Sequence, residues 1–534
     1  MRACAGVLVA MLLLAGCGAS HAAGASIPRS RTFIDAVAAL PGDLDVSATP
    51  GPAAAAIVPS WSSELVRPRG VAPGPNAQLP PADAVVPYLA TSWRIAPDGD
   101  ATFQLRHGVR GPTGDPFTAA DVAWSIDRDL AISPAAPYLF SLAHIDRANP
   151  VTVLGAYAVR INVTAPSPFL LGVLSWYGAG IYDRQLLRAH ATPSDPWAEQ
   201  WGETNSATFA AYYVALFQQS QQIVLLANPY SWVHPYYRKV KIEQMSDSGD
   251  RLNAVLAGTV DHTSGLAWDD FTSATQFGWA SHVHAGILQN GPAVESWLLN
   301  VTQGPLRKPA VRAAISLAVD RADLAGQTWG GYATPDVLAL PRAYGQVQPA
   351  GYDLAAARAL LAAAGYRHGF TLKVSVPFDL GDGNQGEELY LLTHQLALIG
   401  ITLEPQVGYD DDQTLALAAS HQLTSLIEDI APSIGGAPFA LLTDYSTTLD
   451  PASPAAAFGF DDPALEALLR KLATTPASTP TTGLLTRIVA LVDANSPWIN
   501  LFELPTQNVT RSDIAGYAAY AVPVTYYEYL HPVR

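Results

Sequence analysis

Two adjacent acids, Glu428 and Asp429, are the residues of this chain whose types and position most clearly offer binding chemistry. They follow a strand-like run, Leu423–Ile427, and lead towards Pro432. A free amino group of a ligand favours a carboxylate partner, because charge-assisted hydrogen bonds are short and strong. Asp429 is therefore the carboxylate candidate of the sequence. The alternative is an acid in a solvated turn or at a helix cap.

Catalytic motifs do not accompany this pair. The sequence has no Gly-x-Ser-x-Gly, no His-Glu-x-x-His, no phosphate loop and no Gly-x-Gly-x-x-Gly. Glu387 and Glu388 are neighbours on an expected helix, so their carboxylates point in different directions and do not face each other. We therefore expect a protein that is not an enzyme, and a surface hydrolase is the weakest alternative.

The sequence also gives no support for a metal ion or another cofactor. His282 and His284 form a close pair without a third partner. The loop 377–386 is rich in Asp, Asn and Gly but fails the spacing of a calcium loop. We interpret it as the rim of a pocket and expect its Asn384 to contact ligand. Trp176 and Tyr177, followed by Gly-Ala-Gly, are expected either to line the same cleft or to pack in the core.

The amino terminus has the pattern of a secretory signal. Arg2 precedes an apolar stretch, Gly6–Ala15, that is too short to span a bilayer. The run Leu14-Ala15-Gly16-Cys17 looks like the lipobox of a bacterial lipoprotein, which implies cleavage before Cys17 and lipid on its sulfur. Two acyl chains would give a stable membrane anchor. The alternative is an ordinary signal peptide that ends near Ala23.

Composition narrows the class of protein. The formal net charge is −16, and no basic run is present, which argues against nucleic-acid binding. Cys4 would leave with the signal and Cys17 would carry lipid, so the mature body has no disulfide and no thiol nucleophile. We expect a monomer that is anchored by its tether, residues 17–30, and does not span the membrane.

Short strand-like and helical patterns alternate along the chain, which predicts α/β layers. Thr118 and Asp121 form a capping box before a helix. Pro309 begins another helix, whose apolar face carries Val311, Ala314, Ile315 and Ala318. Further expected elements are a helix capped by Asp353, a strand over 370–376, a helix over 387–399 that Gly400 ends, and a strand over 401–403.

Several separated blocks resemble the bacterial extracellular solute-binding proteins of the peptide/nickel family, known as family 5. The signature runs from Tyr88-Leu89-Ala90-Thr91-Ser92-Trp93 to Phe117-Thr118-Ala119-Ala120-Asp121-Val122. The others are Asn228-Pro229-Tyr230-Ser231-Trp232, the helix–Gly258–Val260-Asp261 order, Val311 to Arg321, and the helix–Gly400–strand pattern. The resemblance extends from about residue 44 to 516.

The resemblance implies a large, three-domain, two-lobed fold like that of periplasmic binding proteins, with a ligand cleft between the lobes. Residues 1–16 would be the signal peptide and 17–30 the tether. Lobe I would comprise 31–66, 200–292 and 501–534, with an extra domain at 67–199. Lobe II would be 293–500.

The resemblance also implies roles for particular residues. Asp429 would bind the amino group of a peptide, and Asn300 would order the first hinge crossing and contact ligand. The Trp that relatives place shortly before this Asp is absent, and the loop 377–386 lacks the Arg of dipeptide-specific members. Strict dipeptide specificity is therefore disfavoured. Arg184 or Arg342 would be the alternative partner of a ligand carboxylate, unless both are surface charges.

The function that the resemblance implies is the capture of oligopeptides by lobe closure and their delivery to the permease of an ABC importer. The protein would act outside the cytoplasm, on the outer face of the cell membrane. The alternative is an envelope lipoprotein of the same fold that binds a glycolipid or haem and takes no part in transport.

Overall fold

The structure of the chain is a computed structural model. It describes residues 32–47, 56–72, 84–276, 283–288, 294–335, 351–376, 385–406, 411–430, 436–451, 453–476, 479–495, 497–520 and 524–533. Cys17, the tether and Asn384 lie outside these ranges. No helix within them is long and apolar enough to cross a membrane.

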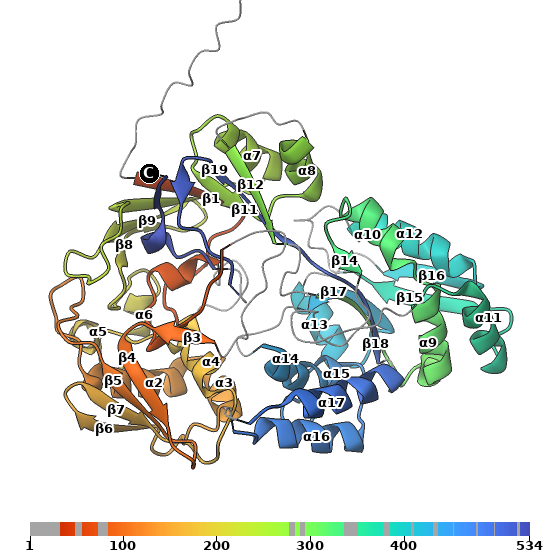
Figure 1. The fold of residues 1–534 in the computed structure, drawn as a ribbon, viewed down its shortest axis with the longest axis horizontal. Helices are drawn as coiled ribbons and strands as arrows, with labels where there is room; N and C mark the ends of the chain where they lie inside the picture. Colours follow the sequence, from red (N-terminus) through yellow and green to blue (C-terminus); the bar gives the residue numbers. More distant parts are fainter. Residues whose placement is uncertain are drawn as a thin grey trace, which may run out of the picture. The chain divides into compact units, whose positions relative to one another are not determined.

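The first sheet joins segments that are far apart in the sequence. It has seven strands in the order β12-β19-β11-β1-β10-β9-β8, with β1 parallel to both β10 and β11. Figure 1 shows the red β1 close to the blue β19, with the green β11 between them in the hydrogen-bonding order. The strands are β1 (Thr32–Val37), β8 (Tyr212–Gln218), β9 (Gln222–Ala227), β10 (Lys239–Gln244), β11 (His262–Ser264), β12 (Val283–Leu288) and β19 (Thr506–Arg511).

The second sheet carries the acids singled out in the sequence. It has six strands in the order β14-β18-β13-β17-β15-β16, and β15 runs parallel to β16 and to β17. The strands are β13 (Val294–Leu299), β14 (Thr334–Pro335), β15 (Phe370–Ser375), β16 (Ile401–Gln406), β17 (Ser425–Ile430) and β18 (Trp498–Glu503).

A four-stranded antiparallel sheet and two short pairs complete the strands. The order of the sheet is β4-β5-β7-β6. Its strands are β4 (Ala90–Ile95), β5 (Ala101–Leu105), β6 (Val151–Gly155) and β7 (Ala158–Ile161). The pairs are β2 (Val66–Pro68) with β3 (Val85–Pro87), and β20 (Ile514–Ala515) with β21 (His531–Pro532).

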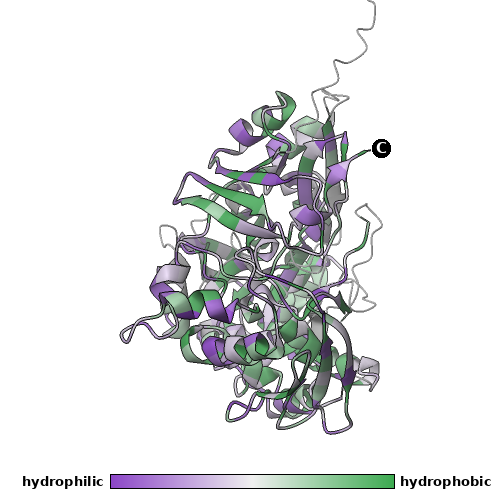
Figure 2. Cartoon of the chain, turned by 90° about the vertical axis from the view of Figure 1, so that its left-hand side faces the viewer, coloured by the Kyte–Doolittle hydropathy of each residue, from purple (hydrophilic) through white to green (hydrophobic). Residues whose placement is uncertain are grey.

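The helices follow the strands in three groups along the chain. Figure 2 shows both hydropathy colours on these helices, as expected for helices that bury one face. The first group is α2 (Ala119–Ile132), α3 (Ala136–Leu142), α4 (Leu170–Leu174), α5 (Arg184–His190) and α6 (Glu199–Gly202). The second is α7 (Ser248–Leu256) and α8 (Trp268–Gln276). The third is α9 (Pro309–Ala318), α10 (Arg321–Thr328), α11 (Leu354–Ala363), α12 (Gln385–Ala397), α13 (Asp411–Ala419), α14 (Gly436–Tyr445), α15 (Pro454–Ala457), α16 (Pro463–Ala473) and α17 (Thr482–Asn495).

The local signals for helix starts are confirmed. The Thr118 backbone N–H donates to Asp121 Oδ2 at 2.7 Å, which is half of the capping box expected at α2. The Asp353 carboxylate accepts the backbone N–H groups of Ala355 and Ala356 at 2.9 Å and caps α11. The apolar face predicted for α9 is buried, and the mixed layers confirm the α/β class.

One boundary was predicted wrongly. The sequence ends the strand before Glu428, whereas β17 continues through Asp429 to Ile430. Pairing with β13 on one side extends the strand beyond the point where two acids would favour a turn. Neither acid therefore belongs to a turn or a helix cap.

Asp183 is a buried acid at the start of α5. Its Oδ1 accepts the backbone N–H groups of Gln185 and Leu186 at 3.1 Å, while its Oδ2 has no hydrogen-bond partner among the described residues. Burial, together with the negative charges of Asp115 and Asp121, raises the pKa of the Asp183 carboxyl to about 6. The folded protein therefore keeps this carboxyl protonated up to a higher pH than the unfolded chain does.

We expect Asp183 to make the free energy of unfolding fall as pH rises from about 4 to about 6, because the folded chain then binds more protons than the unfolded chain. Asp183→Asn keeps a good helix cap. It should remove up to about 3 kcal/mol of this pH dependence, at roughly 1.4 kcal/mol per pKa unit. Urea unfolding at acidic and neutral pH measures the difference. The exposed Asp461→Asn is the control, and an unchanged difference in Asp183→Asn would contradict the prediction.

Candidate ligand-binding site

The candidate acids lie in two neighbouring rows that cross the second sheet. Glu428 of β17 is in register with Ser296 of β13, which in turn is in register with Asn500 of β18. In the next row, Asp429 is in register with Glu295. Successive residues of a strand belong to opposite faces of the sheet. Glu428 and Asp429 therefore occupy rows on opposite faces, and a ligand on one face meets only one of the two rows.

The first row is a connected set of polar groups, which we call the polar row: Glu428, Ser296 and Asn500. The Ser296 hydroxyl donates to Asn500 Oδ1 at 2.8 Å, and both residues are buried. Arg321, at the start of α10, donates from Nε to the Asn500 carbonyl at 2.7 Å. A helix thus fixes the backbone of β18 at this row. Glu428 is half-buried at the end of the row and can accept further hydrogen bonds.

The second row, Asp429 with Glu295 and Phe502, lies beside an aromatic cluster. The ring of Phe502 is 5.9 Å from Trp329, whose Nε1 donates to Glu388 Oε1 at 2.8 Å. Trp329 is in turn 5.2 Å from Trp268, at the start of α8. Trp268 lies between β11 and β12 of the first sheet in the chain, and Trp329 follows α10, between β13 and β14 of the second sheet. This row is therefore at a place where the parts that carry the two sheets meet.

The two sheet faces bury different cores. Trp297, Ile427 and Ile499 belong to one hydrophobic cluster, whereas Leu298 and Trp498 belong to another. Because side chains alternate between the two faces of a strand, the polar row lies on the same face as Leu298 and Trp498. That cluster also includes residues of α3, α4 and α14.

Asn300 holds the end of β13 in place. Its side chain is fully buried, and Nδ2 donates to the Leu423 carbonyl at 2.9 Å. Its Oδ1 accepts from the Thr302 backbone N–H at 3.1 Å and from the Thr302 hydroxyl at 2.6 Å. These bonds fit the ordering role that we predicted, because they use both ends of the amide inside the protein. Contact with ligand stays a prediction.

Trp176 and Tyr177 contact each other and the neighbouring core. Their ring centroids are 5.4 Å apart, and both side chains are half-buried. The Tyr177 carbonyl accepts from the Ser62 hydroxyl at 2.9 Å, and burial raises the pKa of the Tyr177 hydroxyl. Trp176 packs against the hydrophobic cluster that contains Leu298 and Trp498, and Tyr177 packs against the cluster that contains Trp61. Contact of the pair with ligand stays a prediction.

Some predicted residues lie outside the described part of the chain. These are Cys17, Asn384, most of the loop 377–386, and Arg342. Arg184, the first residue of α5, is described. Its Nε lies 3.9 Å from Asp121 Oδ1 of α2. The Arg184 side chain is half-buried, and its contact with a ligand carboxylate stays a prediction.

Four residues near the rows were missed by sequence reasoning: Glu295, Ser296, Asn500 and Glu503. All are buried, in strands whose six residues are buried throughout. Glu503 is in register with Val294 of β13 and with Thr334 of β14. The available signal was a polar residue inside an apolar strand, because polar groups in such strands need a partner or a function. Which strands pair could not be derived from that signal.

The arrangement is suited to holding a ligand by hydrogen bonds. Carboxylate, hydroxyl and amide oxygens accept hydrogen bonds from ammonium and peptide N–H groups. Among the described residues, no group of three His, Cys, Asp or Glu side chains could hold a metal ion. The rows therefore offer carboxylate, hydroxyl and amide groups, most of which are buried.

The chain has α/β layers, and polar side chains gather within its second sheet. They lie next to the place where the two parts that carry the larger sheets meet. This is the construction of a solute-binding protein. The family model described as bacterial extracellular solute-binding proteins, family 5 Middle, matches residues 84–449. The chain belongs to this family, whose members are binding proteins and not enzymes.

Curated relatives match the chain over part of their length. The glutathione-binding protein GsiB of Salmonella choleraesuis (strain SC-B67) is 25% identical over 335 residues, 59% of this chain and 59% of that protein. The periplasmic murein peptide-binding protein MppA of Escherichia coli (strain K12) is 22% identical over 329 residues, 56% of this chain and 59% of that protein. The chain thus spans less than two thirds of the length of these relatives.

Solved structures agree over nearly the whole chain. The substrate-binding protein CtaP of Listeria monocytogenes gives a TM-score of 0.80 at 17% identity, with 94% of this chain and 99% of that chain covered. DppA of Helicobacter pylori, in complex with the peptide STSA, gives 0.76 at 20% identity, with 94% and 98% covered. The fold is therefore the periplasmic-binding-protein fold that the sequence predicted.

Proposed function

We propose that the protein is the substrate-binding lipoprotein of an ABC importer and that it captures oligopeptides. The observation that carries the proposal is the register of Asp429 with Glu295, at the carboxyl end of β17. A carboxylate at that end of a central strand would bind the amino group of a peptide. The peptide backbone would be held by strand-like hydrogen bonds.

The relatives support this assignment by what they are named to bind. GsiB is a glutathione-binding protein, MppA a murein peptide-binding protein, and the DppA structure holds a peptide. Family membership alone would leave the ligand open, because a family 5 protein from Brucella suis, NikA, was solved with Fe(III)-EDTA. The acids in the central sheet favour a ligand that carries an amino group.

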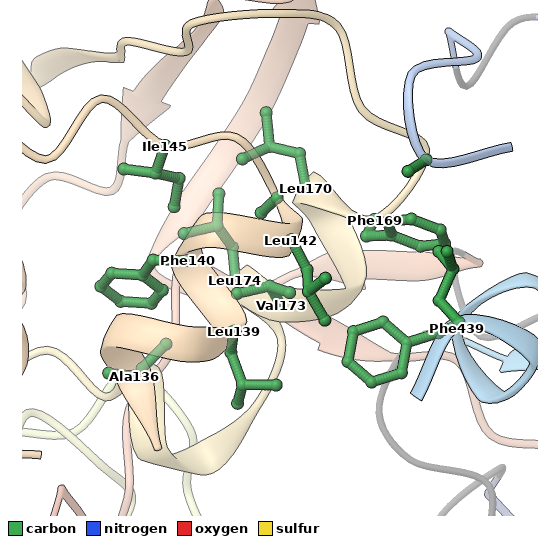
Figure 3. Close-up of a cluster of buried hydrophobic side chains, with 14 of the residues drawn as sticks. Ala136, Leu139, Phe140, Leu142, Ile145, Phe169, Leu170, Val173, Leu174 and Phe439 are labelled. Carbon is green, nitrogen blue, oxygen red and sulfur yellow. The ribbon is translucent and has the colours of Figure 1, made fainter. Parts of the chain in front are cut away.

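We propose that binding is coupled to closure of the two lobes. Figure 3 shows Phe169, at the start of α4, beside Phe439 of α14, and their ring centroids are 5.6 Å apart. The Tyr138 hydroxyl also donates to Asp450 Oδ2 at 2.8 Å. These contacts join residues 136–174 to residues 436–450. A ligand that makes better contacts in such a closed state than in an open one would shift the population towards it.

The domain limits remain our proposal. Lobe I would comprise 31–66, 200–292 and 501–534 with the extra domain 67–199, and lobe II would be 293–500. The strands of the three larger sheets fall within these ranges, except that β18 (Trp498–Glu503) crosses the limit at residue 500. Lipid attachment at Cys17, a permease partner and the monomeric state are parts of the same proposal.

Incubation with a mixture of short peptides tests the proposal against a hydrolase. We expect the protein to retain some peptides, in equal molar amount, and to release them intact on unfolding. Mass spectrometry of the released and the unbound peptides gives both results. Sustained appearance of cleaved products would contradict a role restricted to binding, and failure to retain any peptide would contradict the peptide assignment.

A further inference from the structure

A cavity of about 530 Å³ lies at the edge of the second sheet where β15 and β16 begin. It is lined by α11, by the loop that leads into β15, and by the turn 398–400 after α12; we call it the α11 pocket. Figure 1 shows α11 near the ends of β15 and β16. The candidate ligand site is at the other end of β15, where Ser375 pairs with Leu426. A strand of this length separates the two by roughly 17 Å, so the pocket is a distinct site.

Two glycine turns in contact form one wall of the α11 pocket. Gly369 has a φ of +73° and Gly400 has a φ of +85°. A Cβ on Gly369 would lie 1.7 Å from the Gly400 carbonyl oxygen, so only glycine permits this approach. The close approach brings the loop that carries Arg367 and His368 against the end of α12. The shape of the pocket is thus fixed by backbone contact.

The polar side chains of the α11 pocket are two arginines, Arg358 and Arg367, and one histidine, His368. The sequence has no acid between Leu354 and Val376, although the chain as a whole has a net charge of −16. Arg367 and His368 are exposed, and neither side chain has a hydrogen bond or ion pair with another described residue. The pocket is a local concentration of positive charge on an acidic protein.

Helix ends account for only part of this charge. The carboxyl ends of α11 and α12 carry partial negative charge, which cations stabilise. Arg358 donates from Nε and Nη2 to the Leu398 carbonyl at 3.1 and 2.8 Å, and Lys308 donates to the Ala364 carbonyl at 2.8 Å. These two side chains hydrogen-bond to carbonyl groups near the helix ends. Arg367 and His368 make no such bonds with described residues, and three of the five Arg358 N–H groups remain for a ligand.

The remaining lining is apolar. Alanine, leucine and isoleucine side chains of α11 and of the 398–400 turn face the cavity. Leu398, in this lining, is 49% exposed. A ligand here would present an anionic group to the arginines and an organic group to the apolar wall. Planar guanidinium groups match phosphate oxygens in pairs.

We propose that the α11 pocket binds a phosphate ester, through Arg358, Arg367 and His368. The ester belongs either to a free metabolite or to the headgroup of a phospholipid, since both present the same phosphate. The clustered positive charge favours a phosphate over a single carboxylate, and the cavity volume is within the range of small-molecule sites.

The test compares the purified full chain with Arg367→Gln/His368→Gln and with the control Arg147→Gln, an exposed arginine elsewhere. Calorimetry with glycerol 3-phosphate tests the free ester. Flotation with phosphatidylglycerol vesicles, against phosphatidylcholine vesicles, tests the headgroup. Any lipid anchor is common to the three proteins and cancels in the comparison. Circular dichroism and urea unfolding establish that the variants fold.

We expect the double variant to bind glycerol 3-phosphate or phosphatidylglycerol vesicles at least tenfold more weakly than the parent and Arg147→Gln. Binding should also weaken as salt is added. Weaker binding of glycerol 3-phosphate by the double variant would assign a free ester. Weaker binding of phosphatidylglycerol vesicles alone would assign a headgroup. Equal behaviour of the three proteins in both assays, or equal losses in both variants, would overturn the proposal. Peptide binding does not enter these readouts, so failure here leaves the proposed transport function untouched.

Discussion

Arg67→Met should lower the free energy of unfolding by about 3–5 kcal/mol, because it leaves two buried acids without their cation. Arg67 is 1% exposed and donates from Nε to Glu64 Oε2 at 3.0 Å and from Nη1 to Glu528 Oε1. Its guanidinium also lies 3.4 Å from the centroid of the Tyr88 ring. The three charged residues join the amino-terminal segment to the carboxyl-terminal segment. Urea unfolding measures the loss.

The matched control for Arg67→Met removes the acids as well. Arg67→Met combined with Glu64→Gln and Glu528→Gln should recover much of the stability, since no uncompensated charge then remains buried. Burial already raises the pKa of the Glu64 carboxyl, which indicates how costly its charge would be without Arg67. A loss below about 1 kcal/mol, the level of an exposed ion pair, would contradict this account of the cluster.

Asp429→Asn should weaken the binding of peptides with a free amino terminus by about thirtyfold or more, corresponding to the 2–5 kcal/mol lost when one member of a buried charge pair is removed. N-acetylated peptides carry no such charge and should bind the variant and the parent equally. Calorimetry with matched free and acetylated peptides gives both affinities. Equal loss for the two peptides, or no loss for either, would remove Asp429 from the site.

The two rows make this experiment sharper. Glu428→Gln tests the row on the opposite face of the sheet, so only one of the two substitutions should discriminate between free and acetylated peptides. Glu404→Gln is a matched control, because Glu404 is an exposed acid in β16 of the same sheet. A comparable loss in Glu404→Gln would mean that general charge, and not the site, governs affinity.

Local elements of this fold were predictable because their signals are local. The Thr118–Asp121 capping box, the Asp353 cap and the apolar face of α9 each depend on residues within a few positions of one another. The extent of β17 was not predictable in this way. Two acids have low strand propensity, and only pairing with β13, more than a hundred residues earlier, carries the strand through them.

The candidate site shows the same limit. Asp429 is a candidate because the acid follows an apolar strand and because the sequence resembles a family. Ser296, Asn500 and Glu295 were missed, because each becomes a neighbour of the acids only through the register of β13 with β17 and β18. Long-range pairing of this kind is set by packing and is not written in any one segment.

Native mass spectrometry of protein purified from cells that make it tests the central claim most directly. The account predicts a 1:1 complex with short peptides, which are released intact when the protein unfolds. Sequencing of these peptides would also give the length and the side chains that the site accepts. A co-purified glycolipid or haem in place of peptide would contradict the account and support the envelope protein that does not take part in transport.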